Sequence, residues 1–353
     1  MWNRNALSER LNLEWPILQA PMGDFTTPAL AAGVSNAGGL GGLGMFGFSA
    51  EDAKRRINGF RQQSGGSLNV NYLLWPAPKD LPTDGGPIGA RLQELYAEKG
   101  LGPVPPPATG AGEIAVDHLA MLADAKPEAV SVHFGLPDRE TVSAIKDAGC
   151  YLICSATTVA EARSLEADGA DAIIAQGAEA GGHRGTFSGV DISQQAGLFA
   201  LLPQVVRAVS VPVIAAGGIA DGHTIAAAIM LGASGVQLGT AFLRCAEAKV
   251  PDVHRAALAT ADDASTLVTH AVTGKPARMI RNRLVDEMSA VKEHALPFPA
   301  QLSVTKSLAE ADDAELTTLY CGQSASLTRE MLASELVATL GAESTARLNA
   351  FVS

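Results

Sequence analysis

The chain has 353 residues, of which 47% are hydrophobic, with 36 glycines, 19 prolines and a formal net charge of -11. This composition is typical of a large α/β core with many tight turns, and it excludes a disordered or fibrous protein. Lys and Arg are scattered rather than clustered, so we expect no binding of nucleic acid.

Targeting signals and covalent cross-links are also not indicated. The first 13 residues mix charges of both signs, and no run of about 18 apolar residues exists that could span a membrane. Four cysteines in apolar surroundings, at positions 150, 154, 245 and 321, are too few for a disulfide framework, and we expect no metal site. The expected location is the cytoplasm, and the expected state is a monomer or homodimer.

Strand-like runs alternate with helical patterns along most of the chain. The eight predicted strands are 16–20, 34–39, 67–74, 129–134, 150–156, 171–177, 211–218 and 235–240. Helical spacing is clearest between them at 50–63, 138–149, 158–169, 198–210 and 222–232. This repetition predicts a (β/α)8 barrel of the TIM type over residues 1–250, in preference to a doubly wound sheet.

Three regions lie outside this alternation. Residues 75–112 are rich in Pro and Gly and are predicted to form a lid over the active-site mouth. Residues 251–327 are predicted to be an α-helical subdomain on the substrate side, and 328–353 a closing helix that packs back on the barrel.

The first glycine-rich motif is GGLGGLG at 38–44, which contains the G-x-G-x-x-G spacing of dinucleotide-binding folds. No helix opens directly on its last glycine, and no ribose-binding acid follows about twenty residues later. A glycine-rich turn between a strand and a helix of a barrel is therefore the preferred interpretation.

The most informative stretch runs from 172 to 185, AIIAQGAEAGGHRG. Gln176 places an amide at the carboxyl end of a predicted strand, where barrels carry their chemistry. Several glycines, including Gly181, then allow the backbone to approach a ligand. Among them His183 is the residue that could exchange a proton near neutral pH, so it is the candidate catalytic residue.

A second pair of glycine-rich turns follows the last two predicted strands. AAGGIADG contains Gly217 and Gly218, and QLGT contains Gly239 and Thr240. In barrels that bind phosphate, the loops after strands seven and eight form the phosphate site. The plain alternative is two tight turns without a ligand.

Two further strands carry polar side chains. Asn69 and Asn71 alternate on the third strand and so face one side, where two amides in a barrel interior need a ligand or neighbour. His133 ends the fourth strand, where contact with substrate and a structural hydrogen bond to a nearby loop are equally plausible.

These motifs, together with QAPMGDFTTPALAAGVSNAGGLGGLG, NVNYLLWP and VSVHFGLP, resemble in order and spacing the flavin-dependent nitronate monooxygenases. The resemblance runs from about 17 to 244 and implies FMN in the barrel mouth with His183 beside the flavin. The residues that it implies around the cofactor are Pro21, Met22, Asn69, Gln176, Gly181, Gly217, Gly218, Gln237, Leu238, Gly239 and Thr240. His133 is the expected substrate-binding residue.

The implied reaction is oxidation of an alkyl nitronate, such as propionate 3-nitronate, by O2 to a carbonyl compound and nitrite. His183 would stabilise the nitronate oxygens or, if neutral, abstract the α-proton of a nitroalkane. Its loop holds no carboxylate except that of Glu179 to raise the basicity of the histidine. This favours stabilisation of the nitronate oxygens over proton abstraction. NAD(P)H:quinone reductases and flavin-dependent enoyl-thioester reductases use the same barrel and remain the alternatives.

Overall fold

The computed structural model describes residues 2–82 and 85–352, and its centre is an eight-stranded, all-parallel sheet. The strands are β1 (Ile17–Gln19), β2 (Gly41–Gly44), β3 (Leu68–Leu73), β4 (Ala129–His133), β5 (Tyr151–Ala156), β6 (Ala172–Gln176), β8 (Val213–Ala216) and β9 (Gly235–Leu238). Their order is β1-β9-β8-β6-β5-β4-β3-β2. A parallel bridge between Leu18 and Leu40 joins the two ends, so the sheet closes into the predicted barrel.

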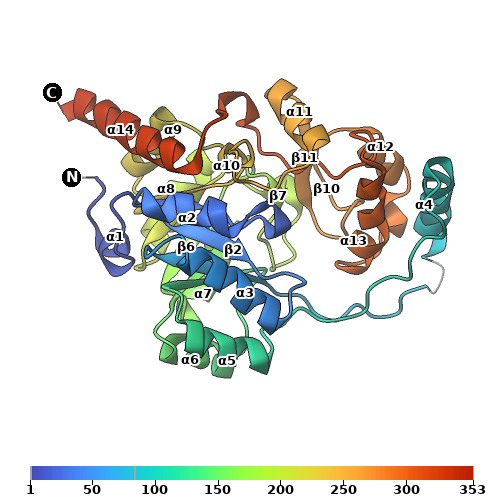
Figure 1. Ribbon diagram of the computed structural model, residues 1–353, viewed down its shortest axis with the longest axis horizontal. Coiled ribbons are helices and arrows are strands. Elements are labelled where there is room, and N and C mark those ends of the chain that lie inside the picture. Colours follow the sequence, from blue (N-terminus) through green and yellow to red (C-terminus); the bar gives the residue numbers. More distant parts are fainter. Residues whose placement is uncertain (1, 83–84, 353) are drawn as a thin grey trace.

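Helices cover the outside of the barrel (Figure 1). They are α2 (Pro28–Asn36), α3 (Ala50–Arg61), α5 (Val116–Ala125), α6 (Arg139–Asp147), α7 (Val159–Ala167), α8 (Leu198–Ala208), α9 (Gly222–Met230) and α14 (Ala333–Val352). Local sequence sets several starts, since Ser49, Asp138 and Thr158 each accept a hydrogen bond from the third helical amide. Helix α14 packs against α9 and α2, where the eighth helix of a barrel belongs.

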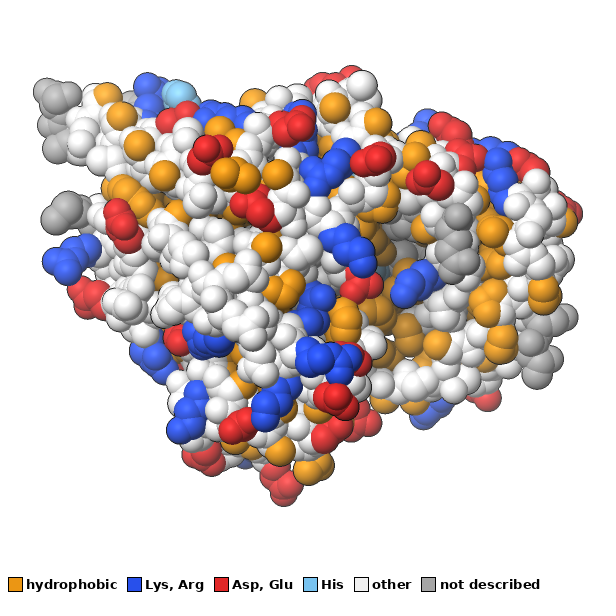
Figure 2. All heavy atoms as spheres, in the orientation of Figure 1, with side chains coloured by type: hydrophobic (Ala, Val, Ile, Leu, Met, Phe, Trp, Pro, Cys, Tyr) orange, Lys and Arg blue, Asp and Glu red, His pale blue; other side chains and the backbone are white. Residues whose placement is uncertain are grey.

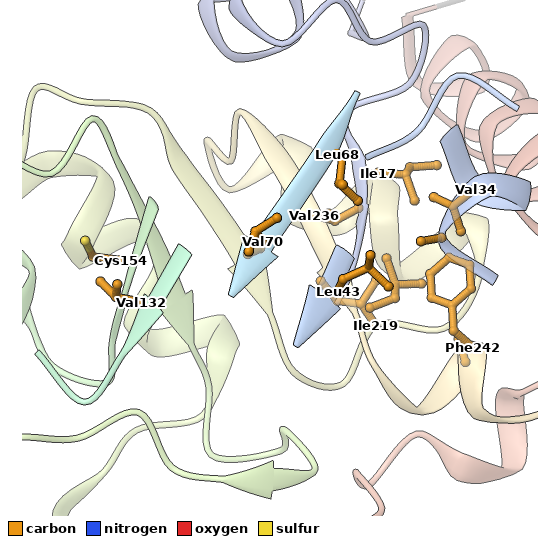
Figure 3. Close-up of a cluster of buried hydrophobic side chains, with 14 of the residues drawn as sticks. Ile17, Val34, Leu43, Leu68, Val70, Val132, Cys154, Ile219, Val236 and Phe242 are labelled. Atoms are coloured by element: carbon orange, nitrogen blue, oxygen red, sulfur yellow. The ribbon is translucent and has the colours of Figure 1, made fainter. Parts of the chain in front are cut away.

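Alternation along the strands separates two cores. Ile17 faces the helices whereas Leu18 faces the barrel interior, and along β5 Cys154 and Ile153 divide in the same way. Figure 3 shows Val34 of α2 directed into the outer cluster that also holds Ile17. Helix α1 (Ala6–Arg10) adds Leu7 to the inner core.

The prediction of the second strand is wrong. Residues 34–36 are the end of α2, and the strand is the glycine motif itself, β2. A Cβ on Gly41 would lie 2.2 Å from the Ala31 carbonyl oxygen, and one on Gly42 would lie 2.8 Å from the Gln19 oxygen. The motif is therefore neither a dinucleotide turn nor a strand-to-helix turn, because its glycines let α2 and β1 pack closely on a strand.

The segment 75–112 leaves the barrel mouth instead of covering it as a whole. Its ends pair with each other through Trp75 and Gly112, and its middle forms α4 (Gly86–Lys99). Figure 1 shows α4 on the side of α12 and α13 that faces away from the barrel. Ile88, Leu92 and Tyr96 of α4 are buried there in a separate hydrophobic core.

This second core belongs to a body that also contains strands, which departs from the expected all-helical segment. Its elements are α11 (Asp252–Thr260), β10 (Thr266–Thr269), β11 (Ala277–Ile280), α12 (Arg283–Ser289) and α13 (Ala300–Thr305), preceded by the short α10 (Thr240–Leu243) that follows β9. Ion pairs between Arg91 and Glu287 and between Arg283 and Glu98 join α4 to α12. Among the described residues, no helix combines the length and apolar character needed to cross a membrane.

Candidate active site

His183 lies where the barrel meets the second body. Gly182 and His183 form the short strand β7, which pairs antiparallel with Ala277 and Arg278 of β11. The φ of Gly182 is +72°, a conformation that favours glycine. The loop after β6 is thus fixed to a strand that follows it by almost a hundred residues.

The protonation state of His183 follows from its partners. Its Nε2 lies 3.0 Å from Thr273 Oγ1, and that hydroxyl donates its own hydrogen to the Lys275 carbonyl oxygen at 2.9 Å. Nε2 therefore carries the hydrogen, and Nδ1 keeps a lone pair that no described group binds. Burial lowers the pKa of His183 to about 3, helped by the charges of His133 and Lys275, so the imidazole is neutral at neutral pH.

Aromatic rings surround this imidazole. The ring centroids of Phe134, Phe298 and Tyr320 lie 6.0, 5.3 and 5.6 Å from that of His183. Phe298 in turn contacts the rings of Trp75 and Phe46. Figure 2 shows apolar side chains in the hollow between the barrel and the second body. A ligand at Nδ1 would therefore be largely shielded from water, which strengthens electrostatic interactions there.

His133 and Gln176 both hold the loop through its backbone. His133 Nε2 donates to the His183 carbonyl oxygen at 3.2 Å, and Gln176 Nε2 donates to the same oxygen at 3.1 Å. Gln176 Oε1 also accepts from the Gly185 amide at 2.8 Å. Burial lowers the pKa of His133 to about 4. The structure thus supports a positioning role for the two residues that were expected to touch substrate and cofactor.

A buried cation that sequence reasoning missed completes this support. Arg184 is 1% exposed and donates to the Gly177 and Gln176 carbonyl oxygens at 2.6 and 2.8 Å. Its Nε donates to Gln195 Oε1 at 2.8 Å. Burial lowers the pKa of Arg184 to about 10, so it remains charged while it ties both ends of the loop together.

The predicted glycine turns converge into one cradle. A Cβ on Gly181 would lie 2.5 Å from the Gly322 amide nitrogen, and one on Gly217 would lie 3.0 Å from the Ala180 nitrogen. Thr240 Oγ1 accepts a hydrogen bond from the Gly322 amide at 2.9 Å. Segment 320–324, to which sequence reasoning gave no role in the site, therefore joins the cradle.

Several donors in the cradle have no partner among the described residues. The Gly218 amide, which belongs to a residue with a φ of +70°, and the Gly239 amide make no hydrogen bond to a described group. The hydroxyl of Thr240 accepts from Gly322 and has its own hydrogen left to donate. Backbone amides of this kind, together with a hydroxyl, form a typical phosphate site.

Two buried acceptors in the barrel interior are also without partners. Asn69 donates through Nδ2 to Ser131 Oγ at 2.9 Å, but its Oδ1 is orphaned, as is the Oε1 of Gln237. Asn69 pairs with Ala129 and Gln237 pairs with Ala216 on the neighbouring strands. Both alanines belong to the inner core, so both amides face the barrel interior. A buried acceptor without a donor is costly, so these oxygens indicate a ligand.

The remaining predicted contacts lie at the end of β1 and β9. A Cβ on Gly239 would lie 3.9 Å from Met22 Sδ, and one on Gly42 would lie 3.5 Å from Pro21 Cδ. Leu238 is different, because its side chain is buried in the outer core and its carbonyl oxygen accepts from the Ala20 amide at 2.8 Å.

Comparison with known proteins identifies the family that this chain resembles. A family model described as nitronate monooxygenase matches residues 4–343. A probable nitronate monooxygenase of Staphylococcus aureus (strain MSSA476) is 36% identical over 351 residues, which cover 96% of this chain and 97% of the relative.

Solved structures show the same similarity in three dimensions. A nitroalkane oxidase from Streptomyces ansochromogenes is 38% identical, with a TM-score of 0.89, 99% of this chain covered and 100% of the other. FabK from Thermotoga maritima is 29% identical, with a TM-score of 0.75 and coverages of 99% and 98%.

Proposed function

Because this chain belongs to the nitronate monooxygenase family of oxidoreductases, we propose that it oxidises alkyl nitronates with O2, using FMN, to a carbonyl compound and nitrite. The observation that carries the proposal is the neutral His183, with Nδ1 free in an aromatic pocket beside a glycine cradle. Propionate 3-nitronate is one substrate that this reaction would consume.

The residues present fit a flavin mononucleotide. The Gly218 and Gly239 amides and the Thr240 hydroxyl would hold its phosphate. The orphaned oxygens of Asn69 and Gln237 would accept from its hydroxyl or ring N–H groups. When bound, the flavin would supply the oxidation of the nitronate and the reaction with O2.

His183 is proposed to act as a base when the substrate is a neutral nitroalkane. Its Nδ1 lone pair would take the α-proton, while Thr273 holds Nε2–H and so fixes the tautomer. The Glu179 carboxylate does not assist, because it accepts from the Leu198 amide at 2.8 and 2.9 Å. A neutral Nδ1 has no hydrogen to offer a nitronate oxygen, which favours this role over anion stabilisation.

Oxygen uptake tests the activity directly. We expect the purified protein to consume O2 and release nitrite with propionate 3-nitronate. The comparison is NADH oxidation with a quinone or an enoyl thioester. Rapid NADH oxidation without nitronate turnover would instead favour the two reductase alternatives on the same barrel.

The cofactor is expected to be FMN and not FAD. The cradle offers one compact set of phosphate donors, and the glycine motif at β2 is a packed strand rather than a second phosphate site. Chromatography of the flavin released by denaturation would distinguish the two. FAD, or no flavin after reconstitution, would contradict the assignment of the cradle.

The pH dependence with a neutral nitroalkane follows from the low pKa of His183. A base must be unprotonated, so activity is lost as pH falls through its pKa. With a pKa near 3, His183 stays unprotonated at pH 5 and can act as a base. An ordinary histidine would be mostly protonated below about pH 6.5. We expect kcat/KM for nitroethane to show no acidic loss between pH 8 and pH 5. A loss centred near pH 6.5 would show that His183 has an ordinary pKa in the substrate-free enzyme, which would contradict this prediction.

A further inference from the structure

Lys275 is a cationic side chain beside the site to which sequence reasoning gave no role. It lies between β10 and β11, two residues after Thr273, which holds His183. Its Nζ is 4.3 Å from the centroid of the Phe134 ring, and that centroid is 6.0 Å from the His183 ring centroid. The ammonium group and the imidazole are therefore separated by about one aromatic ring.

The ammonium group has no anionic partner among the described residues. No described carboxylate oxygen lies within 4.0 Å of Lys275 Nζ, although the side chain is half-buried. Glu161 is the carboxylate that favours its charged form most, but its oxygens are occupied by Thr157, Thr186 and Ser188. The face of the Phe134 ring stabilises this partly desolvated cation, but it supplies no counter-ion, so Lys275 is suited to bind an anion.

A groove of about 470 Å³ reaches the same position. Residues with apolar side chains predominate in its lining, and those beside Lys275 in that lining include Leu74, Trp75, Ile114, Phe134, Leu136 and Phe187. Its two carboxylates, Glu113 and Asp138, are exposed to solvent. Methylene groups would therefore pack along the wall, and an anionic end would be favoured at Lys275 rather than near either carboxylate.

We propose that Lys275 binds a carboxylate at the far end of the substrate, so that the enzyme selects short nitronates carrying an acid group. The inference rests on the proposed function, because it assumes a nitro group held beside His183 Nδ1. The short carbon chain follows from the single ring that separates the two positions.

The test compares the nitronates of 3-nitropropionate and 1-nitrobutane, which have similar length and differ in the carboxylate. Kinetics are measured for the flavin-loaded wild type, Lys275→Met and Lys275→Arg. In Lys275→Met we expect the ratio of the two kcat/KM values to fall roughly 10- to 100-fold, mostly through KM, as for a lost charged hydrogen bond. Lys275→Arg should keep most of the ratio. Effects of the lysine charge on His183 cancel, since both substrates react there.

A matched control removes the charge of an exposed lysine that does not line the groove. Lys249→Met lowers the net charge equally and should leave the ratio unchanged. An unchanged ratio in Lys275→Met, whether activity is retained on both substrates or lost equally, would overturn the inference. If the wild type oxidises neither nitronate, the proposed function itself fails, which is a distinct result.

Discussion

Replacing His183 by Asn is expected to leave the flavin bound while lowering turnover of a neutral nitroalkane by roughly 10² to 10⁴, the usual contribution of a positioned base. The cradle donors lie on other loops, so flavin content should match the wild type. Asn has no basic nitrogen, so it cannot take the α-proton. Turnover of preformed nitronates should survive better, because that proton is already gone.

The comparison of the two substrate forms gives this experiment its meaning. Equal losses on nitroalkane and nitronate would show that His183 stabilises negative charge instead. Full activity on both would remove His183 from the mechanism and make His133 the candidate. Thr273→Val serves as a second probe, since it removes the acceptor that fixes the His183 tautomer and should slow nitroalkane turnover less than His183→Asn.

Valine at Gly181 or Gly218 is expected to lower flavin content at least roughly tenfold, the factor that corresponds to 1.4 kcal/mol. A Cβ at position 181 would lie 2.6 Å from the Cys321 carbonyl carbon and displace the segment whose Gly322 amide holds Thr240. At position 218 the φ of +70° disfavours any β-branched residue, and the free amide there would shift. Flavin absorbance per protein after gel filtration measures the effect.

Gly189 offers a matched control for the second variant. Its φ is +74°, and a Cβ there would meet no atom within 4 Å. Gly189→Val therefore imposes similar backbone strain on a different turn, and it should keep its flavin while losing some thermal stability. Wild-type flavin content in both cradle variants would show that Gly181 and Gly218 serve only as turn formers.

The barrel could be predicted from the sequence because most of its strands are short apolar runs between helical patterns. The strand β2 could not be predicted, because glycine has a low strand propensity. Glycine is needed at positions 41 and 42 because the backbone oxygens of Ala31 and Gln19 leave no room for a side chain. Such close approach depends on the tertiary structure, so it cannot be predicted from the periodicity of a single segment.

The candidate site divides in the same way. His183 and the glycine turns could be predicted because they follow the ends of predicted strands, where barrels carry their active sites. Thr273, Lys275 and Phe298 come from the second body, and their approach to His183 depends on the pairing of β7 with β11. Local patterns cannot reveal such a contact, which explains why the tautomer of His183 and the position of Lys275 beside the site could not be predicted from the sequence.

The hydrophobic core of the second body can form only late in the synthesis of the chain. Helix α4 and α12 are linked by Arg91 and Glu287, which are 196 positions apart in the chain. At synthesis rates of 5–20 residues per second, α4 leaves the ribosome roughly 10 to 40 seconds before its partner. During that interval Ile88, Leu92 and Tyr96 lack the partners of this core that follow residue 270, so the nascent chain exposes part of an apolar helix face.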